Sequence, residues 1–523
     1  MECKWMMAIL FIGIGIRSTN GQSPGSLDLT YGDQGKKILP LGTGNAFGRS
    51  IAIQPDGKSI MASIANNGTS NDFAVLRLTP EGQPDLEFGD SGMIITDFDS
   101  RTDIAEAIAL DDMNRIIVAG SIENTTGFDF GVARYLPDGN LDESFSDDGL
   151  NTTEVGVTGF CKAVAVQQDN KIVLGGYAIN PLTGTNEFVL VRYRTDGVID
   201  STFDHDGIVK TNMDIGSGVA NAMLIQPDGK IVLAGQVLNE STFAWEIGIA
   251  RYNEDGSLDE SWGDFGIVLT TSPLVSHTIN AVALQDDQKI VVGGFNGTAP
   301  STNLFTVARY NTNGEIDKTF GTDGLVIDSY GAQDNQINTL VIQPDGNILI
   351  AGSTLLGNAD QLAIARLTED GSFDDAFGDE GIVIDAFGQN DAIEAMALQQ
   401  DGKLLVTGES FDGNRFSVVA ARYETGLTTD VQEPGAELIA FDVYPNPAFE
   451  KITLAYQLAE NSMVRVRLYS SDGQLVHIFL NQPQSIGGHL ETFTLPQNLS
   501  AGMYWLSLET GKGTTVKKLV VMK

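Results

Sequence analysis

The sequence predicts an all-β protein in which seven similar four-stranded units are followed by a smaller β domain. Three observations lead to this prediction. One phrase rich in Asp and Gly recurs seven times, the intervals between its copies hold four short apolar stretches each, and this rhythm stops well before the C-terminus. A chain of 523 residues is long enough for such an array to bury a large core.

Residues 1–21 are expected to be a secretory signal peptide. A lysine near the start precedes an apolar run from Trp5 to Ile16, and small and polar residues follow. The run is shorter than the roughly 20 residues that a membrane-spanning helix needs, and no later segment supplies them, so we expect no transmembrane segment in the mature chain. Cleavage would remove Cys3 and leave Cys161 as a lone buried thiol.

The apolar stretches have the character of strands. In the fifth unit they read "GIVLTTS", "INAVALQ", "KIVVGGF" and "LFTVARY", each bounded by Gly, Asp, Asn or Pro and without a helical period. The second and third stretches are joined by "QPDGK" or a variant of it. Gly57, Gly229 and Gly346 in these turns are expected to adopt a positive φ, which closes an antiparallel hairpin.

The arginines of the fourth stretches give the period, because they are separated by 57, 58, 59, 58, 57 and 56 residues. Seven regular four-stranded units predict a seven-bladed β-propeller over residues 22–424. An open β-solenoid is the alternative, but its ends need atypical caps that the first and last units do not provide. If residues 35–41 pair with the last blade, they close the ring as a clasp.

We expect each of these arginines to form a structural, bidentate ion pair with the aspartate of the phrase that follows. The alternative is that the arginines line the central channel and bind an anion. The aromatic residue of each phrase is expected to fill the wedge between neighbouring blades. The arginines are Arg77, Arg134, Arg192, Arg251, Arg309, Arg366 and Arg422, and the aspartates are Asp28, Asp85, Asp142, Asp200, Asp259, Asp317 and Asp374.

Composition and motifs exclude several function classes. The formal net charge of −38 disfavours a nucleic-acid partner, which clustered Lys and Arg would bind. Nucleophile elbow, zinc-protease, P-loop and paired-cysteine motifs are absent from the sequence, and its four histidines are scattered, so we assign no catalytic, cofactor-binding or metal-ligating residue. Calcium is a minority hypothesis for "DESFSDDG" and "DSTFDHDG", against the alternative that these phrases form structural Asx-type turns.

The phrases "LDxxFGxxG", "ALQxDGKI" and "ARY" resemble the delta-60 repeat, a bacterial repeat that is expected to build β-propellers, over residues 25–423. Ser146 and Asp204 replace the usual glycine of the phrase, and Leu78 and Leu367 replace the tyrosine of "ARY". These departures do not affect the fold assignment.

A linker over residues 425–440 precedes a second domain, residues 441–523. Alternation of apolar residues in "KITLAY" and "VRVRLY" predicts a small Ig-like β-sandwich of about seven strands. "VYPNPAFEKITLAY" and "LSAGMYWLSLETGKGTTVKKLVVMK" resemble the C-terminal (Por) sorting domain, type A, of type IX secretion substrates. This resemblance implies export by the type IX secretion machinery from a bacterium of the Bacteroidetes type, to the extracellular space or the outer-membrane surface.

We therefore expect a secreted, non-catalytic propeller that acts as a binding or scaffold module for an extracellular glycan or protein. The loops that differ between units share one face, opposite the repeated phrases, and are expected to carry the binding site. The alternative is a hydrolase or lyase acting on an extracellular polysaccharide. Paired acids in one blade that break the sevenfold pattern and converge near the channel would favour this alternative.

Overall fold

The computed structural model describes residues 22–427, except 100, 272–274 and 298–302, and residues 441–522, except 447, 450, 459–460, 471–474, 497–498, 500–501 and 511–512. The expected signal peptide and residues 428–440 of the expected linker lie outside these ranges. The described residues form two compact units that divide after Leu427. All their regular elements are strands, and they include no helix that is long and apolar enough to cross a membrane.

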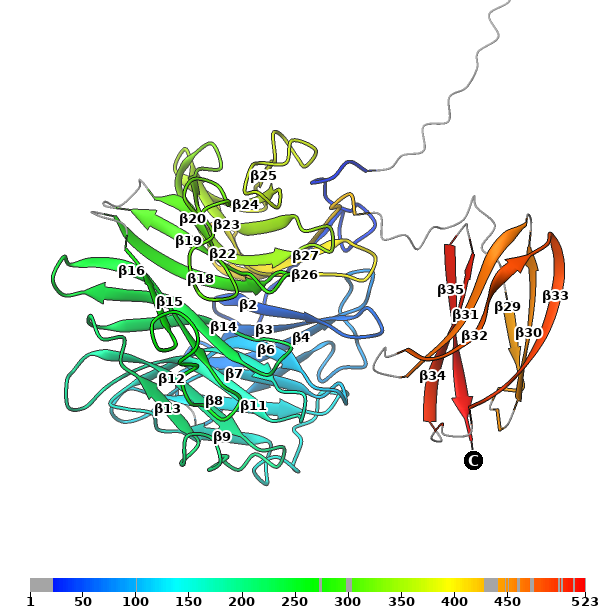
Figure 1. The fold of residues 1–523 in the computed structure, drawn as a ribbon. Helices are drawn as coiled ribbons and strands as arrows, with labels where there is room; N and C mark the ends of the chain where they lie inside the picture. Colours follow the sequence, from blue (N-terminus) through cyan, green and yellow to red (C-terminus); the bar gives the residue numbers. More distant parts are fainter. Residues whose placement is uncertain are drawn as a thin grey trace, which may run out of the picture. The chain divides into compact units, whose positions relative to one another are not determined.

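The first unit is the predicted propeller of seven antiparallel four-stranded sheets, or blades (Figure 1). Blades 1 to 3 consist of β2 (Ala46–Ile53), β3 (Ser59–Asn66), β4 (Asn71–Leu78) and β5 (Met93–Thr96); of β6 (Asp103–Leu110), β7 (Ile116–Glu123), β8 (Phe128–Tyr135) and β9 (Leu150–Thr153); and of β10 (Gly159–Val166), β11 (Ile172–Ile179), β12 (Asn186–Tyr193) and β13 (Ile208–Thr211).

The remaining blades follow the same order. Blades 4 to 6 consist of β14 (Gly218–Ile225), β15 (Ile231–Asn239), β16 (Ala244–Tyr252) and β17 (Ile267–Thr270); of β18 (Ser276–Leu284), β19 (Ile290–Gly297), β20 (Leu304–Tyr310) and β21 (Leu325–Asp328); and of β22 (Gln333–Ile342), β23 (Ile348–Leu356), β24 (Ala359–Leu367) and β25 (Ile382–Asp385). Blade 7 consists of β26 (Asn390–Leu398), β27 (Leu404–Phe411), β28 (Phe416–Tyr423) and, from the other end of the chain, β1 (Lys36–Leu39).

The N-terminal strand closes the ring, which is the pairing that the sequence leaves open for residues 35–41. β1 pairs antiparallel with β28, with Lys36 opposite Ala421 and Leu39 opposite Val418, and so forms the outer edge of blade 7. In the other blades this outer strand comes from the segment that follows the Asp-rich phrase. The phrase therefore does not lead directly into a new blade. It leads first into the outer strand of the same blade, and the chain then crosses to the inner strand of the next.

The turns divide the propeller into two different faces. Gly57 in the first "QPDGK" turn has φ of 84°, and the turn closes through the Gln54 amide, which donates to the Lys58 carbonyl oxygen at 2.8 Å. These turns and the Asp-rich linkers lie at the same ends of the strands, which we call the linker face. The β3–β4 loop and its counterparts, together with the crossings between blades, lie at the opposite ends, the loop face.

A β-bulge recurs in the inner strand of every blade. In β6 the register shifts between Ala105 and Ala107, so that Glu106 is the extra residue. Glycine is required on the facing strand in blades 2 to 7, because a Cβ on Gly120, for example, would lie 1.9 Å from the carbonyl oxygen of Ile104. The bulged residues of the seven blades are Arg49, Glu106, Lys162, Asn221, Asn280, Asn338 and Glu394.

The predicted Arg and Asp residues meet at the blade junctions on the linker face. Each arginine lies on the third strand from the axis and is buried, so the alternative of an anion-binding arginine ring around the channel is wrong. The nitrogen–oxygen distances are 2.7 Å for Arg77–Asp85, 2.8 Å for Arg134–Asp142, 2.9 Å for Arg192–Asp200, 2.7 Å for Arg251–Asp259, 2.8 Å for Arg309–Asp317, 2.8 Å for Arg366–Asp374 and 2.6 Å for Arg422–Asp28.

The geometry of this contact differs from the bidentate fork that the sequence suggests. Arg309 Nε donates to Asp317 Oδ2, whereas Asp317 Oδ1 accepts hydrogen bonds from the amide and the hydroxyl of Thr319, at 3.1 and 2.7 Å. Arg309 Nη1 instead donates to the carbonyl oxygen of Glu369, in the turn of the next blade, at 2.5 Å. One guanidinium thus joins its own linker to the neighbouring blade.

The aromatic residue of the linker completes this junction. Arg309 Cζ lies 4.6 Å from the centre of the Phe320 ring, and Phe320 is fully buried. The same cation–π contact, with distances from 4.3 to 5.0 Å, recurs in all seven linkers. The expected wedge residues Tyr31, Phe88, Phe145, Phe203, Trp262, Phe320 and Phe377 are all buried.

A lysine of the hairpin turn adds a second positive charge in most blades. Burial disfavours the charged form of Asp317, but hydrogen bonds from Thr319 and the positive charges of Arg309 and Lys289 outweigh it and lower the pKa of Asp317 to about 2. Blade 6 lacks both the lysine and the hydroxyl group that bind this aspartate in blade 5, because Asn347 replaces the lysine and Ala376 replaces the threonine. The side chain of Asp374 is accordingly more exposed, at 18% against 6% for Asp317.

The second unit is a β-sandwich of the predicted kind. β29 (Phe441–Tyr444), β30 (Lys451–Leu458) and β33 (Gly487–Thr494) form one sheet, and β32 (Leu475–Gln484), β31 (Ser462–Ser470), β34 (Gly502–Thr510) and β35 (Gly513–Val521) form the other. The alternating apolar residues of β30 and β31 point into one core: Ile452, Leu454, Tyr456, Val464, Val466 and Leu468.

Replacement of Lys36–Leu39 by Gly-Ser-Gly-Ser should lower the thermal midpoint of the propeller more than the same replacement of Leu325–Asp328. Both segments are four-residue outer strands, but only β1 joins the two ends of the ring. Circular dichroism melts of the two variants measure this difference. Equal shifts would show that closure by β1 contributes nothing beyond an ordinary edge strand.

Arg309→Ala should reduce the free energy of unfolding by about 2–4 kcal/mol, because it leaves the buried Asp317 carboxylate without its main partner. Arg194→Ala is the matched control, since Arg194 pairs with Asp196 on the surface, where both side chains are about half exposed, at 51% and 52%. Urea denaturation of both variants measures the effect. A loss at Arg309 no larger than that at Arg194 would refute a structural role for the junction.

Candidate functional site

Four carboxylates of the two Asp-rich linkers considered for calcium are occupied by the chain itself. Asp142 and Asp200 lie in the ion pairs described above, and Asp148 and Asp206 accept hydrogen bonds from the amides of the residues two positions on, both at 2.9 Å. These contacts favour the structural-turn interpretation of "DESFSDDG" and "DSTFDHDG" over a calcium site. Positions that differ between blades are therefore the better candidates for a functional site.

The bulged residues of the inner strands form such a set, which we call the axial ring. The inner strands contact one another around the axis, for example β2 with β6 and with β26. The bulges occupy the same place in every blade, yet their residues range from Arg and Lys through Asn to Glu. The backbone geometry is the same in every blade, but the charge and size of the side chain differ, as expected of a functional site on a repeated scaffold.

The amide half of the axial ring, in blades 4 to 6, is engaged in structure. The Nδ2 atom of Asn221 donates to the carbonyl oxygen of Ile279 at 2.9 Å, and that of Asn280 to Ile337 at 3.0 Å. Asn338 repeats the contact with Ile393, also at 3.0 Å. Each asparagine thus ties its inner strand to the bulge of the next blade.

The charged half, in blades 7 and 1 to 3, contains two ion pairs. Arg49 Nη1 lies 3.5 Å from Glu394 Oε2, and Lys162 Nζ contacts Glu106 Oε1. The Arg49 and Glu394 side chains are 27% and 22% exposed, so solvent reaches both of them. Burial opposes the charge of Arg49, but the surrounding glutamates, with Glu394 foremost, outweigh it and raise the pKa of Arg49.

A further acid, Glu409 on β27, joins Glu394 in the same blade. Burial and the nearby Glu394 carboxylate raise the pKa of Glu409 to about 8, although Arg49 acts in the opposite direction. Burial also raises the pKa of Glu394. Glu409 Oε2 is buried and has no hydrogen-bond partner in the part of the chain that the structure describes. In the other blades this position holds Ile64, Ser121, Tyr177, Gln236, Phe295 and Ser353, so the acid pair is specific to blade 7.

Two groups of half-buried aromatic side chains flank the charged half on the loop face. Phe416 contacts both Phe47 and Phe411, with ring centres 5.4 and 4.9 Å apart, and the Arg49 guanidinium lies 5.5 Å from the Phe47 ring.

In blades 2 and 3, the Phe160 ring lies 5.5 Å from that of Phe128 and 5.3 Å from that of Tyr177. Each aromatic group thus belongs to a pair of blades that also contributes charged residues to the axial ring.

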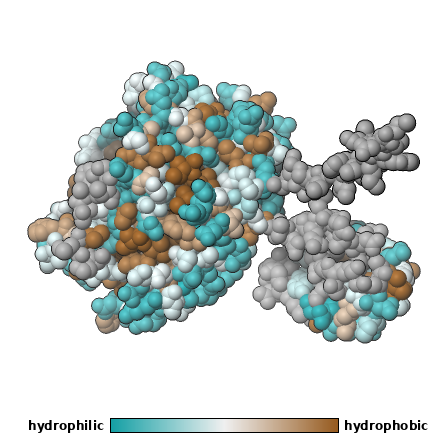
Figure 2. Space-filling view, turned by 90° about the horizontal axis from the view of Figure 1, so that it is seen from above, coloured by the Kyte–Doolittle hydropathy of each residue, from teal (hydrophilic) through white to brown (hydrophobic). Residues whose placement is uncertain are grey.

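Other apolar side chains are exposed on the propeller, and Figure 2 shows brown patches of this kind among hydrophilic residues. Leu182 is 92% exposed and Phe243 is 80% exposed, and both belong to loops of the loop face. These loops were expected to carry the binding site. They carry charged residues too, for example Glu240 in the β15–β16 loop and Asp412 in the β27–β28 loop.

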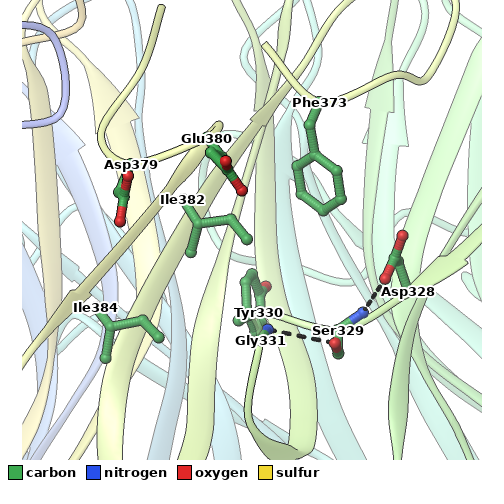
Figure 3. A pocket seen from close by; sticks show the side chains of 9 residues that line it. All are labelled: Asp328, Ser329, Tyr330, Gly331, Phe373, Asp379, Glu380, Ile382 and Ile384. Atoms are coloured by element: carbon green, nitrogen blue, oxygen red, sulfur yellow. Dashed lines mark hydrogen bonds between the residues drawn. The ribbon is translucent and has the colours of Figure 1, made fainter. Parts of the chain in front are cut away.

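A separate hollow of about 570 Å³ lies at the outer edge of blades 5 and 6. Figure 3 shows that Ile382, Ile384 and the Tyr330 and Phe373 rings line it, with Asp379 and Glu380 at one side. Asp328 accepts a hydrogen bond from the Ser329 amide and Ser329 from the Gly331 amide, whereas the buried Tyr330 hydroxyl has no partner among the described residues. The hollow lies at the outer edge of the blades, apart from the axial ring where the acid pair breaks the sevenfold pattern, so the axial ring is the stronger candidate.

The axial ring was missed by the sequence analysis, although a signal for it exists. In "DIAEAIAL" and "AIEAMAL" a polar residue interrupts an apolar inner strand at the same repeat position. When the seven units are aligned, this position varies in charge, whereas its neighbours are mostly apolar and none is charged. Alternation along a half-buried strand predicts the same pattern, which is why the position is not distinctive in any one unit.

Comparison with known proteins supports both units. Residues 442–522 match the family model of a secretion system C-terminal sorting domain. Six segments match a beta-propeller domain of unknown function, DUF5122: residues 54–88, 114–145, 167–203, 226–261, 285–320 and 343–377. No curated protein sequence matches the chain.

Among solved structures the similarity is one of fold. The polysaccharide lyase Uly1 is 11% identical, with a TM-score of 0.46 over 78% of this chain and 93% of that one. A PL25 ulvan lyase is 13% identical, with a TM-score of 0.45 over 73% and 95%. The acylaminoacyl peptidase of Pyrococcus horikoshii is 10% identical, with a TM-score of 0.37 over 79% and 58%. The chain combines DUF5122 beta-propeller repeats with a type IX secretion C-terminal sorting domain, which indicates a secreted or cell-surface protein.

Proposed function

We propose that the propeller, residues 22–424, binds a neutral extracellular glycan at the loop-face end of the axial ring without cleaving it. Residues 1–21 direct the chain across the inner membrane of a bacterium of the Bacteroidetes type. Residues 441–523, after the linker 425–440, direct it through the type IX secretion machinery to the extracellular space or the outer-membrane surface. The observation that carries the binding proposal is the meeting of aromatic rings and acids where the sevenfold pattern is broken.

The chemistry of this region suits a sugar. Aromatic rings such as Phe160 and Tyr177 offer flat apolar surfaces against which the C–H face of a pyranose can pack. Lys162 shares its blade with Phe160, and Glu394 and Glu409 share theirs with Phe411 and Phe416. These charged groups can accept or donate hydrogen bonds to hydroxyl groups. A site with apolar faces and a few convergent polar groups is typical of small-ligand recognition.

The charge of the unit decides between neutral and anionic glycans. Without residues 1–21 the chain carries 29 basic and 68 acidic residues, or −39, and residues 438–523 contribute seven basic and six acidic ones, or +1, which leaves −40 on residues 22–437. Such a field repels sulfated or uronic-acid polymers before they reach the channel. A neutral glycan meets no such barrier.

Hydrolysis of the glycan is the second candidate, favoured specifically by the acid pair. Glu409, with a pKa of about 8, holds its proton at neutral pH, as a general acid must. Glu394, paired with Arg49, is the available second carboxyl group. Two acids from one blade near the axis are the arrangement that a propeller hydrolase would need.

The test is binding of the full chain to a panel of neutral and anionic polysaccharides, measured by affinity electrophoresis. We expect retention by a neutral glycan, and Phe160→Ala should weaken it by about tenfold or more, because a stacked aromatic contributes more than 1 kcal/mol. Phe265→Ala is the control, since Phe265 is 71% exposed in a linker of the opposite face.

Mass analysis of the recovered glycan separates the two candidates. Intact glycan supports binding alone, whereas shortened products that disappear with Glu409→Gln would establish hydrolysis. Absence of binding to every neutral glycan, or binding that Phe160→Ala leaves unchanged, would contradict the proposed site.

A further inference from the structure

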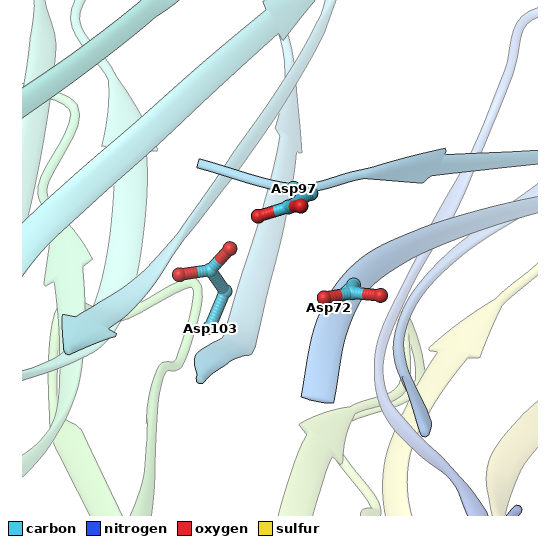
Figure 4. Close-up of side chains that lie close together, drawn as sticks. All are labelled: Asp72, Asp97 and Asp103. Carbon is cyan, nitrogen blue, oxygen red and sulfur yellow. The ribbon is translucent and has the colours of Figure 1, made fainter. Parts of the chain in front are cut away.

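Three carboxylates meet at the junction of blades 1 and 2, on the loop face and away from the Asp-rich linkers. Asp72 lies in β4, Asp97 directly follows β5, and Asp103 is the first residue of β6. One oxygen atom from each lies within 4.8 Å of the others, and Figure 4 shows the three groups facing a common space. This is the only such group of three potential ligands among the residues that the structure describes.

The Asp103 carboxylate is incompletely satisfied. Its side chain is fully buried, and Oδ2 accepts a hydrogen bond from the Phe98 amide at 2.8 Å, but the buried Oδ1 has no partner. Neither Asp103 nor Asp72 belongs to an ion pair within the described ranges. A buried carboxylate oxygen without a donor is costly, and a bound cation is one way of satisfying it.

The pKa of Asp103 also reflects the lack of a nearby positive charge among the described residues. Burial raises the pKa of Asp103 to about 7, and the neighbouring Asp97, Asp72 and Asp99 raise it further against the Phe98 hydrogen bond. Asp72 is better supported, because Asn67 Nδ2 and the Ser70 hydroxyl donate to its two oxygens at 2.8 and 3.1 Å. Asp97 is exposed, so water can complete the coordination of an ion from that side.

We propose that Asp72, Asp97 and Asp103 bind a Ca²⁺ ion that joins blade 1 to blade 2. The donors are all oxygen atoms, which suits a hard cation rather than zinc or copper. Carboxylates from three separate segments with open positions for water suit the flexible coordination of Ca²⁺ better than the strict octahedron of Mg²⁺. Sites of this kind in extracellular modules bind Ca²⁺ with dissociation constants of about 0.1–1 mM.

Blade 7 offers a matched control for the unpartnered oxygen. Asp391 occupies the position of Asp103, is buried, and also has an Oδ1 without a partner. Its Oδ2 accepts from the Phe387 and Gly388 amides. Gln361 and Ala386 stand where Asp72 and Asp97 stand in blade 1, so three carboxylates do not meet there.

The experiment compares the full chain in EGTA and in millimolar CaCl₂, by thermal denaturation and by calorimetric titration with CaCl₂. We expect Ca²⁺ to raise the thermal midpoint by about 2 °C or more and to bind at one site. Asp103→Asn should weaken this binding by about tenfold or more, whereas Asp391→Asn should leave it unchanged. MgCl₂ at the same concentration should give a smaller shift.

Asp97→Asn provides a second variant, because Asp97 is exposed and its replacement leaves the packing of the junction intact. It should also weaken Ca²⁺ binding. The proposal is overturned if the unaltered chain shows neither a shift nor a titration signal. It is equally overturned if Asp103→Asn and Asp97→Asn respond as the unaltered chain does, or if Asp391→Asn loses the response to the same degree, which would indicate diffuse binding to the acidic surface.

Discussion

The propeller depends on one repeated contact, in which a buried arginine holds two blades together. Its Nε atom binds the aspartate of its own linker, its Nη1 atom binds a carbonyl oxygen of the next blade, and its planar face covers the aromatic residue between them. A buried guanidinium is tolerated only when its donors are satisfied, so these partners must all be in place together. The Asp-rich phrase recurs because each blade junction needs the same set of partners.

Confining this contact to the linker face leaves the rest of each blade free to vary. The inner-strand bulge keeps its geometry through a facing glycine, such as Gly120 or Gly408, whichever residue occupies the bulge itself. Blades 4 to 6 use asparagine there to tie neighbouring strands. Blades 7 and 1 to 3 place charges there instead, and Glu409 adds an acid with a displaced pKa. The arginine junctions and the proposed glycan site thus lie toward opposite ends of the blades.

The features that the sequence predicts are those set by local and repeated patterns. The turn glycines, the four strands per unit and the one-to-one pairing of each arginine with an aspartate follow from residues that recur at a fixed spacing. The spacing does not decide whether residues 35–41 close the ring. The sequence does not predict that one carboxylate oxygen of Asp317 binds Arg309 while the other binds Thr319, because this arrangement depends on side-chain geometry in three dimensions. Likewise Asp72, Asp97 and Asp103 share no period, and only the crossing between blades brings them together.

The central claim is that the axial acids are held for a purpose other than stability, which the free energy of unfolding of Glu409→Gln tests most directly. Because the pKa of Glu409 is raised in the folded state, the unfolded chain loses the Glu409 proton at a lower pH than the folded chain does, and the fold loses stability as the pH rises toward about 8. The variant, which cannot ionise there, should be more stable than the unaltered chain, by a margin that grows from about pH 5 to about pH 8. A variant that is less stable across this range would show that Glu409 serves the fold, as the junction arginines do.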